Sequence, residues 1–522
     1  MTTTNVLMTG ISLPACCRLQ QHSTASDLFS VSNTSYLLPV EILRVNSIAG
    51  LSYVVWKCTS RIPSVASSQQ RNKVHSQWVS QHQVSIVYPA SPDANAALGR
   101  GSHDSKFEVD NPRVELWSSQ IGCIGRFTVA KQYIHLGEEA FQAVAFAVIV
   151  RQSLTHQRCH WCFALLRTKA LECGDCAFTR YCSRDCLAAD AELHDFQCQA
   201  LRDLKRKGCD GHLGDVETIR LALAVLSMEQ MVRNPQALRL LNAHNEDGDD
   251  ASDVQHAAEF IVKRTNQHLD RKHVSITLQR VHCNAHPLYL DGVTCVGSGV
   301  FPDAAMALNH SCLPNVAPTF NPRTRTLAFH AIVDIPRGYA VECSYIDLLQ
   351  TRKRRQELLA RGFGFVCVCK RCTNEATLRN MGRDIAESEE ANQVETRVME
   401  ELMQLVNSDC SSVKQRLSCL KKECASFFER NIEARFALYT VKMKLASDQN
   451  DWKRVIKTAE MLLGIWMRCG LPDNYHTTET LHMQIYRAAK HVGMTAKAEA
   501  SVQRVASIRQ ICGYSHPDAA IK

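Results

Sequence analysis

The sequence lacks the features of a membrane or secreted protein. Its 522 residues contain no run of about 18 apolar residues, the length that a membrane-spanning helix needs. The weak apolar patch near the amino terminus has no Lys or Arg before it, which makes a poor signal peptide. We therefore expect an intracellular protein with no membrane partner.

A strong charge of one sign is also missing. The formal net charge is +8, 21% of the residues are charged, and the basic residues are spread along the chain. This balance permits contact with nucleic acid or acidic surfaces but does not require it, so direct nucleic-acid binding stays open.

Cysteine, by contrast, is abundant. The chain has 24 cysteines, and in a reducing compartment clustered cysteines are more often metal ligands than disulfides. Eleven of them fall in two groups at ligand spacings, and thirteen are scattered. We expect the scattered ones, such as Cys16, Cys58, Cys295 and Cys419, to be small core side chains.

The amino-terminal half divides into segments of different character. Residues 1–112 are rich in Ser, Thr and Gln, with strand-like runs at 53–56 and 84–88, and carry no chemistry that we recognise. From Val114 the pattern predicts two short strands around a glycine turn, then a further turn and one strand ending near residue 150. A helix is expected over 216–240.

The acidic stretch at 245–253 is predicted to be a solvated loop. It fails the EF-hand pattern, because Ala251 stands where an oxygen ligand is needed and Gly248 comes too early.

The remaining half begins with strands and ends with helices. Short strands and turns are expected over 277–347, followed by a basic helix over 348–360. Residues 385–510 are helical in pairs, and the last pair, around 476–512, has the spacing of a tetratricopeptide-like repeat.

Eight potential zinc ligands lie within residues 159–198. They form four pairs at ligand spacing: Cys159-x2-Cys162, Cys173-x2-Cys176, Cys182-x3-Cys186 and His194-x3-Cys198. Zinc takes four such ligands in a tetrahedron, and a spacing of x3 puts two ligands on one side of a helical turn. The order predicts two interleaved sites, with the first and third pairs on one ion and the second and fourth on the other.

These sites are expected to be structural, since no coordination position stays open. The pattern, with Tyr181-Cys182-Ser183 at its middle, resembles the MYND finger. The resemblance implies a protein-interaction module that binds proline-rich peptides, and the segment has no basic helix for reading DNA.

A second constellation lies downstream. The run Asn309-His310-Ser311-Cys312-Leu313-Pro314-Asn315 is followed by Tyr345 in a Y-I-D context and then by Cys367-x-Cys369-x2-Cys372. Three cysteines leave a zinc ion one ligand short, and Cys312 is the obvious fourth. We therefore expect three zinc ions per chain.

These motifs together resemble the SET domain and its post-SET zinc site. Other SET-like runs are Gly125-Arg126, Asn284-Ala285 and Gly297-x-Gly299-x-Phe301-Pro302. A MYND finger inserted in a SET domain is the arrangement of the SET and MYND domain (SMYD) family of protein-lysine methyltransferases. The resemblance covers about 114–375.

The resemblance implies an α+β protein: a β-rich SET fold with an inserted MYND double-zinc finger, a post-SET zinc site and an all-α tetratricopeptide-like carboxyl-terminal domain. The expected segments are an extension of unknown role (1–112), the first part of the SET domain (113–158), the MYND finger (159–198), a helical insertion (199–276), the SET core (277–350), the post-SET segment (351–375) and the helical domain (376–522).

The resemblance also implies how S-adenosylmethionine is held. Asn309 and His310 would bind the cofactor, Asn284 its amino-acid end, and Phe365 would cover the adenine. The remaining candidates are Gly125, whose turn allows close backbone approach, and Arg126, for the carboxylate.

Tyr345 would be the catalytic residue, with its hydroxyl pointed at the methyl-transfer centre and in contact with the cofactor. The acceptor lysine of a histone or non-histone protein must lose its proton. With a pKa near 10.4, only about 0.1% of free lysine is neutral near pH 7.4, so a narrow apolar channel is expected to lower that pKa.

Four departures from the family pattern stand out. Ile121 replaces a basic residue, His286 stands where Phe is usual, and Phe363 where a Tyr commonly lines the lysine channel. The stretch from Pro302 to Asn309 is one residue longer than usual, so we expect a bulged strand. Cofactor binding should survive, whereas turnover and the degree of methylation stay open.

An alternative function is a catalytically weak SET and MYND adaptor that acts through protein contacts in transcriptional regulation. Retention of Asn309, His310 and Tyr345 favours the enzyme. We expect a monomer in cytoplasm and nucleus. The basic run 352–355 suits either a nuclear-import or nucleic-acid patch or, preferably, a solvated helix face.

Overall fold

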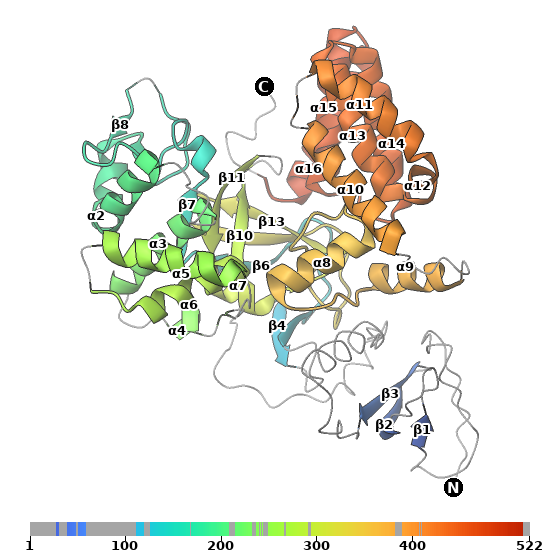
Figure 1. Cartoon of the computed structure of the whole chain (residues 1–522), viewed down its shortest axis with the longest axis horizontal. Coiled ribbons are helices and arrows are strands. Elements are labelled where there is room, and N and C mark those ends of the chain that lie inside the picture. The colour runs from blue at the N-terminus through green and yellow to red at the C-terminus, as the bar shows by residue number, and fades with distance from the viewer. Residues whose placement is uncertain are drawn as a thin grey trace. The chain divides into compact units, whose positions relative to one another are not determined.

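The computed structural model describes most of the chain (Figure 1). The described residues are 28–30, 39–48, 51–58, 111–118, 126–167, 169–207, 215–231, 236–239, 241, 243, 249–265, 268–290, 294–381, 389–406, 408 and 410–514. Two compact units are distinguished: one of Met1–Ser105, Trp117–Gly125 and Cys367–Asp384, the other of Lys106–Leu116, Arg126–Val366 and Ile385–Lys522.

Among its described residues, the first unit contains a small antiparallel sheet in the order β1-β2-β3 and a helix. The strands are β1 (Leu28–Ser30), β2 (Pro39–Ile48) and β3 (Leu51–Cys58), and the helix is α9 (Lys370–Met381). The strand predicted at 53–56 lies in β3, whereas the one predicted at 84–88 and Cys16 lie outside the described residues.

Short strands form the centre of the second unit. They are β4 (Val114–Ser118), β5 (Arg126–Ala130), β6 (Glu139–Val144), β7 (Ala147–Val150), β10 (Ala285–Tyr289), β11 (Cys295–Val300), β12 (Asn309–His310), β13 (Val316–Asn321), β14 (Thr326–Ala331) and β15 (Glu342–Cys343). They pair as β4-β5, β10-β11-β7, β13-β14-β6 and β12-β15. The one strand predicted before residue 150 is therefore two, β6 and β7, which belong to different sheets.

The core of these sheets is apolar and rich in phenylalanine. Phe141, Phe301 and Phe329 are almost wholly buried in one cluster. Glycine is required where two strands approach each other: a Cβ on Gly297 would lie 2.0 Å from the carbonyl oxygen of Ile149 on the neighbouring strand. This close approach explains the first glycine of the G-x-G motif.

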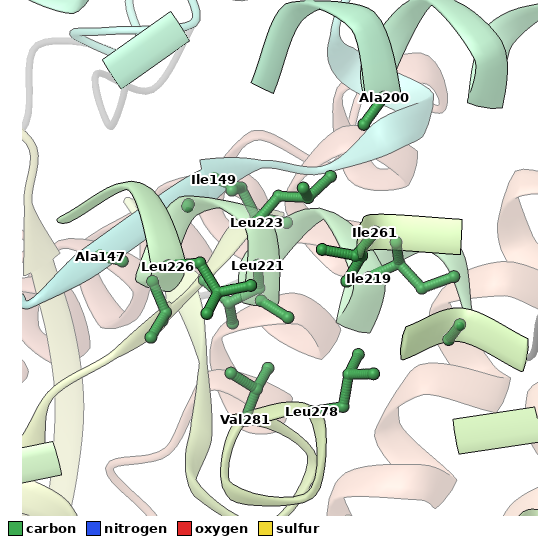
Figure 2. Close-up of a cluster of buried hydrophobic side chains, with 14 of the residues drawn as sticks. Ala147, Ile149, Ala200, Ile219, Leu221, Leu223, Leu226, Ile261, Leu278 and Val281 are labelled. Atoms are coloured by element: carbon green, nitrogen blue, oxygen red, sulfur yellow. The ribbon is translucent and has the colours of Figure 1, made fainter. Parts of the chain in front are cut away.

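A helical layer covers β7. Its helices are α2 (Arg184–Lys207), α3 (Val216–Met231), α4 (Gln236–Arg239), α5 (Asp249–Arg264) and α6 (Arg271–Asn284), and a short 3-10 turn, η2 (Gln152–Leu154), comes just before the finger. Figure 2 shows the cluster that holds the layer together, in which Leu223 and Leu226 of α3 lie among side chains of β7, α5 and α6. Helix α3 is apolar on nearly all sides because neighbours surround it.

Three local predictions in this region were wrong. The end of the acidic stretch is the first turn of α5, where negative side chains suit the helix dipole. Residues 277–284 belong to α6, whose first turn is capped by the Asp270 carboxylate. In place of a bulged strand after Phe301, the chain forms a short helix, α7 (Pro302–Ala307), with Pro302 in its first turn.

The carboxyl-terminal part is all helix, as predicted. After α8 (Arg352–Phe363) come α10 (Glu389–Val406), α11 (Cys410–Glu423), α12 (Ala425–Arg430), α13 (Ile432–Asp448), α14 (Trp452–Arg468), α15 (His476–His491) and α16 (Thr495–Ile511). Helices α13 to α16 pack as successive neighbours, and their core includes Ala317 and Ile332 of the sheet region, so they rest on it directly.

Two predictions about exposure also fail. Arg355, expected on a solvated helix face, has a fully buried side chain whose guanidinium lies 3.8 Å from the Glu433 carboxylate. Cys419, expected in a core, is exposed on α11. No helix among the described residues is long and apolar enough to cross a membrane.

Candidate functional site

The finger brings its first four cysteines together. The sulfur atoms of Cys159, Cys162, Cys182 and Cys186 all lie within 4.8 Å of one another, and the Cys162–Cys182 and Cys182–Cys186 distances are 3.5 and 3.6 Å. Cys182 follows the short hairpin of β8 (Leu171–Glu172) and β9 (Arg180–Tyr181), and Cys186 lies in the first turn of α2.

The second group lies on the same hairpin and further along the same helix. Cys173, Cys176, His194 and Cys198 offer four ligand atoms within 4.8 Å. The Cys173 and Cys198 sulfurs are 3.8 Å apart, and Nε2 of His194 is 3.6 Å from the Cys176 sulfur. The two groups are the interleaved combinations that the spacing predicted.

Both groups fit a zinc ion. Sulfur atoms about 2.3 Å from a tetrahedral ion lie about 3.8 Å apart, whereas a disulfide would bring them to about 2.0 Å. Burial raises the pKa of the Cys186 thiol to about 11 and that of Cys198 to about 12, so without metal these thiols keep their protons near pH 7. Zinc binding would release those protons, and the affinity for zinc therefore falls as the pH falls.

The third predicted group has the same character. The sulfur atoms of Cys312, Cys367, Cys369 and Cys372 lie within 4.8 Å of one another, and all four residues are buried. Four buried thiols at this separation match the ligand set of a closed structural zinc site.

The candidate methyl-transfer region is assembled by strand pairing. β12, with Asn309 and His310, runs parallel to β15, and Cys343 pairs with His310. Two further backbone bonds extend the contact, from Ser311 N–H to the Cys343 carbonyl (2.8 Å) and from Asn315 N–H to the Glu342 carbonyl (3.0 Å). Residues about thirty positions apart thereby meet.

Tyr345 is fixed by this arrangement at both ends. Its backbone N–H donates to Nδ1 of His310 (3.0 Å), and its hydroxyl donates to the Leu308 carbonyl (2.5 Å). Burial raises the pKa of the Tyr345 hydroxyl well above its usual value, and the charges of Cys343 and Glu342 act in the same direction. The hydroxyl therefore stays protonated at neutral and mildly alkaline pH.

Aromatic rings surround Tyr345. The Phe363 ring lies 4.9 Å from it, the His310 ring 5.4 Å and the Phe365 ring 6.4 Å, measured between centroids. Tyr345, Phe363 and Phe365 are half-buried, whereas His310 is nearly inaccessible. The surroundings of Tyr345 are therefore largely apolar, and its hydroxyl faces the Leu308 carbonyl.

The other predicted residues have varied surroundings. The Asn309 side-chain amide donates to the backbone carbonyl of Arg126 (2.7 Å), which joins β12 to β5. The Asn284 amide donates to the Arg280 carbonyl one turn earlier in α6 (2.7 Å). Gly125 and Ile121 lie outside the described residues.

His286 takes the place of an apolar ring rather than adding a charge. Its ring packs edge-on against Phe301 and Phe329, at 5.9 and 6.3 Å. Burial lowers the pKa of His286 to about 4, so the ring is neutral at physiological pH.

Sequence reasoning missed the role of Asn315. Its side-chain amide donates to the Ala340 carbonyl (2.7 Å), and its side-chain oxygen accepts the Glu342 N–H (2.8 Å). These bonds hold residues 340–342, which lead to Tyr345 in the chain, against the segment that begins at Asn309. The only signal was the position of Asn315 at the end of the motif.

Comparison with known proteins defines the class first. Residues 159–198 match the MYND finger family, and this range includes all eight ligands of the first two groups. The chain thus contains a MYND finger beside a β-rich part.

Individual relatives indicate the family more narrowly than the finger alone does. N-lysine methyltransferase SMYD2-A of Xenopus laevis is 28% identical over 264 residues, covering 48% of this chain and 59% of that protein. SMYD2 of Rattus norvegicus is 29% identical over 265 residues, or 48% of this chain and 58% of that protein. SMYD2-B of Danio rerio is 29% identical over 272 residues, or 49% and 60%.

This chain is therefore related to the SET and MYND domain (SMYD) proteins, and the resemblance inferred from its motifs is confirmed. The relationship supports a SET fold for the β-rich part. The matched region spans somewhat less than two thirds of each of these relatives.

Proposed function

We propose that the chain is a protein-lysine N-methyltransferase that uses S-adenosylmethionine to methylate a histone or non-histone protein. One observation carries the proposal: Asn309, His310 and Tyr345, separated in sequence, meet through the β12–β15 pair and the bond from Tyr345 N–H to His310 Nδ1. The relatives named as lysine methyltransferases support the same activity.

The region fits a cofactor that carries a cation and a flat base. Its half-buried rings, Tyr345, Phe363 and Phe365, offer faces for an adenine and for a sulfonium, which aromatic faces attract. Asn309 and His310 would hold the cofactor from β12, with Asn284, Arg126 and Gly125 as further contacts carried over from the family pattern. When bound, S-adenosylmethionine supplies an electrophilic methyl group.

Tyr345 would act as a positioning hydrogen-bond partner. Because burial raises the pKa of its hydroxyl, Tyr345 would not act as a tyrosinate base at neutral pH. The oxygen retains lone pairs while its proton goes to the Leu308 carbonyl, so it accepts a hydrogen bond from an incoming amine. That contact would align the amine for in-line attack.

The apolar surround would also prepare the lysine. A cationic amine loses hydration among Phe363, Phe365 and His310, which lowers the pKa of the amine and favours the neutral nucleophile. Phe363 offers no hydroxyl at this wall, so the channel would hold fewer polar contacts than one lined by tyrosine.

The other parts would serve the same enzyme. We propose that Cys312, Cys367, Cys369 and Cys372 form a post-SET zinc site, bringing the zinc content to three per chain. The helices α13 to α16 would form a tetratricopeptide-like domain that shapes the groove for the substrate protein. The finger would bind proline-rich peptides, and the protein would act as a monomer in cytoplasm and nucleus.

The decisive test is transfer of a radiolabelled methyl group from S-adenosylmethionine to proteins of a cell extract. We expect labelled lysine with the zinc-loaded protein and a large loss with Tyr345→Phe. A folded, zinc-loaded protein that neither binds the cofactor nor transfers methyl would instead be a SET and MYND adaptor, acting through protein contacts in transcriptional regulation.

A further inference from the structure

The finger is locked into the β-rich core next to its first metal group. Phe163, directly after the ligand Cys162, is fully buried and lies in the same apolar cluster as Phe320 and Phe329. Its ring meets the Phe320 ring edge-on at 5.3 Å. Its φ of 62° is unusual for a side-chain-bearing residue, which indicates that the surroundings impose the conformation.

A cation from the β13–β14 hairpin faces the same metal group. The Arg325 guanidinium lies over the Trp161 ring, 3.6 Å from its centroid, and donates to the Trp161 carbonyl (3.2 Å). Burial lowers the pKa of Arg325, while the negative charges of Asp190, Cys162 and Cys186 act in the opposite direction. Asp190, the first of these groups, forms no ion pair with Arg325 in the described parts of the chain, and Cys162 and Cys186 are two ligands of the first metal group.

A second buried cation lies by the other metal group. Arg220 of α3 is 1% exposed, and its guanidinium lies 4.8 Å from the centroid of the Phe178 ring. The Phe178 N–H donates to the sulfur of the ligand Cys176 (3.4 Å). One nitrogen of Arg220 donates to the Val150 carbonyl (2.9 Å), but Nε and Nη1 have no hydrogen-bond partner among the described residues.

An unpaired buried guanidinium is costly unless a negative charge lies nearby. Carboxylates supply part of that charge, Asp190 for Arg325 and Glu217 and Asp215 for Arg220, and the zinc centres would add to it. Four thiolates (−4) around Zn²⁺ (+2) leave a formal charge of −2, and three thiolates with a neutral histidine leave −1. Each arginine comes from an element outside the finger and lies beside one of these groups.

We propose that Arg325 and Arg220 are the counter-ions of the first and second zinc centres, and that zinc binding and docking of the finger on the fold stabilise each other. The first pairing joins the finger to the β13–β14 hairpin, and the second joins it to α3. Zinc loss would remove the charge of the centres and leave the guanidiniums with carboxylates alone, Asp190 for Arg325 and Glu217 and Asp215 for Arg220, and docking of the finger on the core would weaken. This inference does not depend on methyl transfer.

The test compares zinc retention in charge-removing and charge-keeping variants. Zinc release to increasing EDTA is followed with a chromogenic chelator for Arg325→Gln, Arg325→Lys, Arg220→Met and Arg220→Lys. Loading with Co²⁺ separates the second centre, with three sulfurs and one nitrogen, from the two four-sulfur groups, because these site types absorb differently in the visible range. The four-sulfur group of Cys312, Cys367, Cys369 and Cys372 contributes equally in every variant, so a difference in the four-sulfur signal reports on the first centre. Arg323→Gln on the same hairpin and Lys205→Gln, whose ammonium donates to the Ala177 carbonyl at the second centre, are exposed controls.

We expect Arg325→Gln to weaken metal retention at the first centre, and Arg220→Met at the second, by about tenfold, the size of a partly buried charge interaction. The lysine variants and the controls should retain metal nearly as the parent does. After chelation, Arg220→Met should melt no lower than the parent, because the buried charge that it removes no longer lies beside a charged zinc centre.

Three results would overturn the proposal: retention unchanged in Arg325→Gln and Arg220→Met, lysine variants as weak as the neutral ones, or controls equally impaired. If Arg220→Met fails to fold, the Arg325 pair decides, since that side chain is only half-buried and its loss leaves the core filled.

Discussion

The finger and the region around Tyr345 are both built from short irregular segments, but different forces hold them. In the finger, eight ligand side chains within residues 159–198 converge on two points. Around Tyr345, backbone hydrogen bonds of β12 and β15 and the side chain of Asn315 join segments about thirty residues apart. The finger should therefore depend on metal and little on any single hydrogen bond, whereas the Tyr345 region should show the reverse.

The largest expected effect is that of metal removal. Chelation at neutral pH should unfold residues 159–198, because zinc contributes on the order of 10 kcal/mol to the folding of such modules. Helices α13 to α16 should keep their structure, since their core contains no metal ligand. Amide hydrogen exchange with and without EDTA measures both regions, and equal protection of the finger in the two states would contradict its dependence on metal.

Next in size is the loss of one hydroxyl at the candidate methyl-transfer centre. Tyr345→Phe should lower methyl transfer on the order of 100-fold, as removal of an aligned hydrogen-bonding group does. Cofactor affinity and zinc content should change little. Tyr486→Phe, on α15, is a matched control, and comparable loss of transfer in both variants would rule out a specific role for Tyr345.

A methyl group at Gly297 should damage the sheet beneath the finger. The added Cβ of Gly297→Ala would meet the Ile149 carbonyl and also approach the Phe163 ring to 2.9 Å, so we expect a loss of about 3 kcal/mol or more. Gly464→Ala, with no atom within 4 Å of its Cβ, should instead leave stability nearly unchanged. Urea unfolding measures the difference, and similar midpoints for the two variants would show that the strands are not tightly apposed.

Asn315→Ala should destabilise the Tyr345 region by a smaller amount and leave the finger unaffected. It leaves the Ala340 carbonyl and the Glu342 N–H without their side-chain partner, at a cost of about 1–3 kcal/mol in the free energy of unfolding. Zinc retention by the finger should be that of the parent. Thermal unfolding and metal analysis of one preparation test both statements, and zinc loss from the finger would show that the regions are coupled more tightly than their contacts indicate.

The smallest expected effect lies outside both regions. Nε2 of His273 is 2.8 Å from the Glu229 carboxylate, and this hydrogen bond raises the pKa of His273. The stabilisation is complete below the unfolded pKa of about 6.5 and is lost as the pH rises through the higher folded value. Because the histidine is 44% exposed, it should amount to less than about 1 kcal/mol. His273→Gln should make the melting temperature depend less on pH between pH 6 and pH 8. An unchanged pH dependence would show that other groups cause it.

The two regions also differ in how far the sequence reveals them. The finger's ligand pairs are local, so spacing alone predicted both groupings. The Tyr345 region needed a family resemblance, because nothing local indicates that β12 pairs with β15. Asn315 and the Leu308 carbonyl escaped notice because their roles depend on a tertiary contact.

Errors in the remaining predictions have similar origins. Helix α5 begins within a polar stretch because acidic residues suit a helix amino terminus as well as a loop. Arg355 is buried because Glu433, far along the chain, compensates its charge. The short helix α7 absorbs the residue that sequence spacing had assigned to a bulge.

Calorimetric titration of the zinc-loaded full chain with S-adenosylmethionine tests the central claim most directly. The account predicts saturable binding of one cofactor per chain, retained in Tyr345→Phe and weakened in Asn309→Ala. A folded protein with its three zinc ions that gives no binding heat at several temperatures and no labelled lysine would contradict a methyl-transfer site around Tyr345.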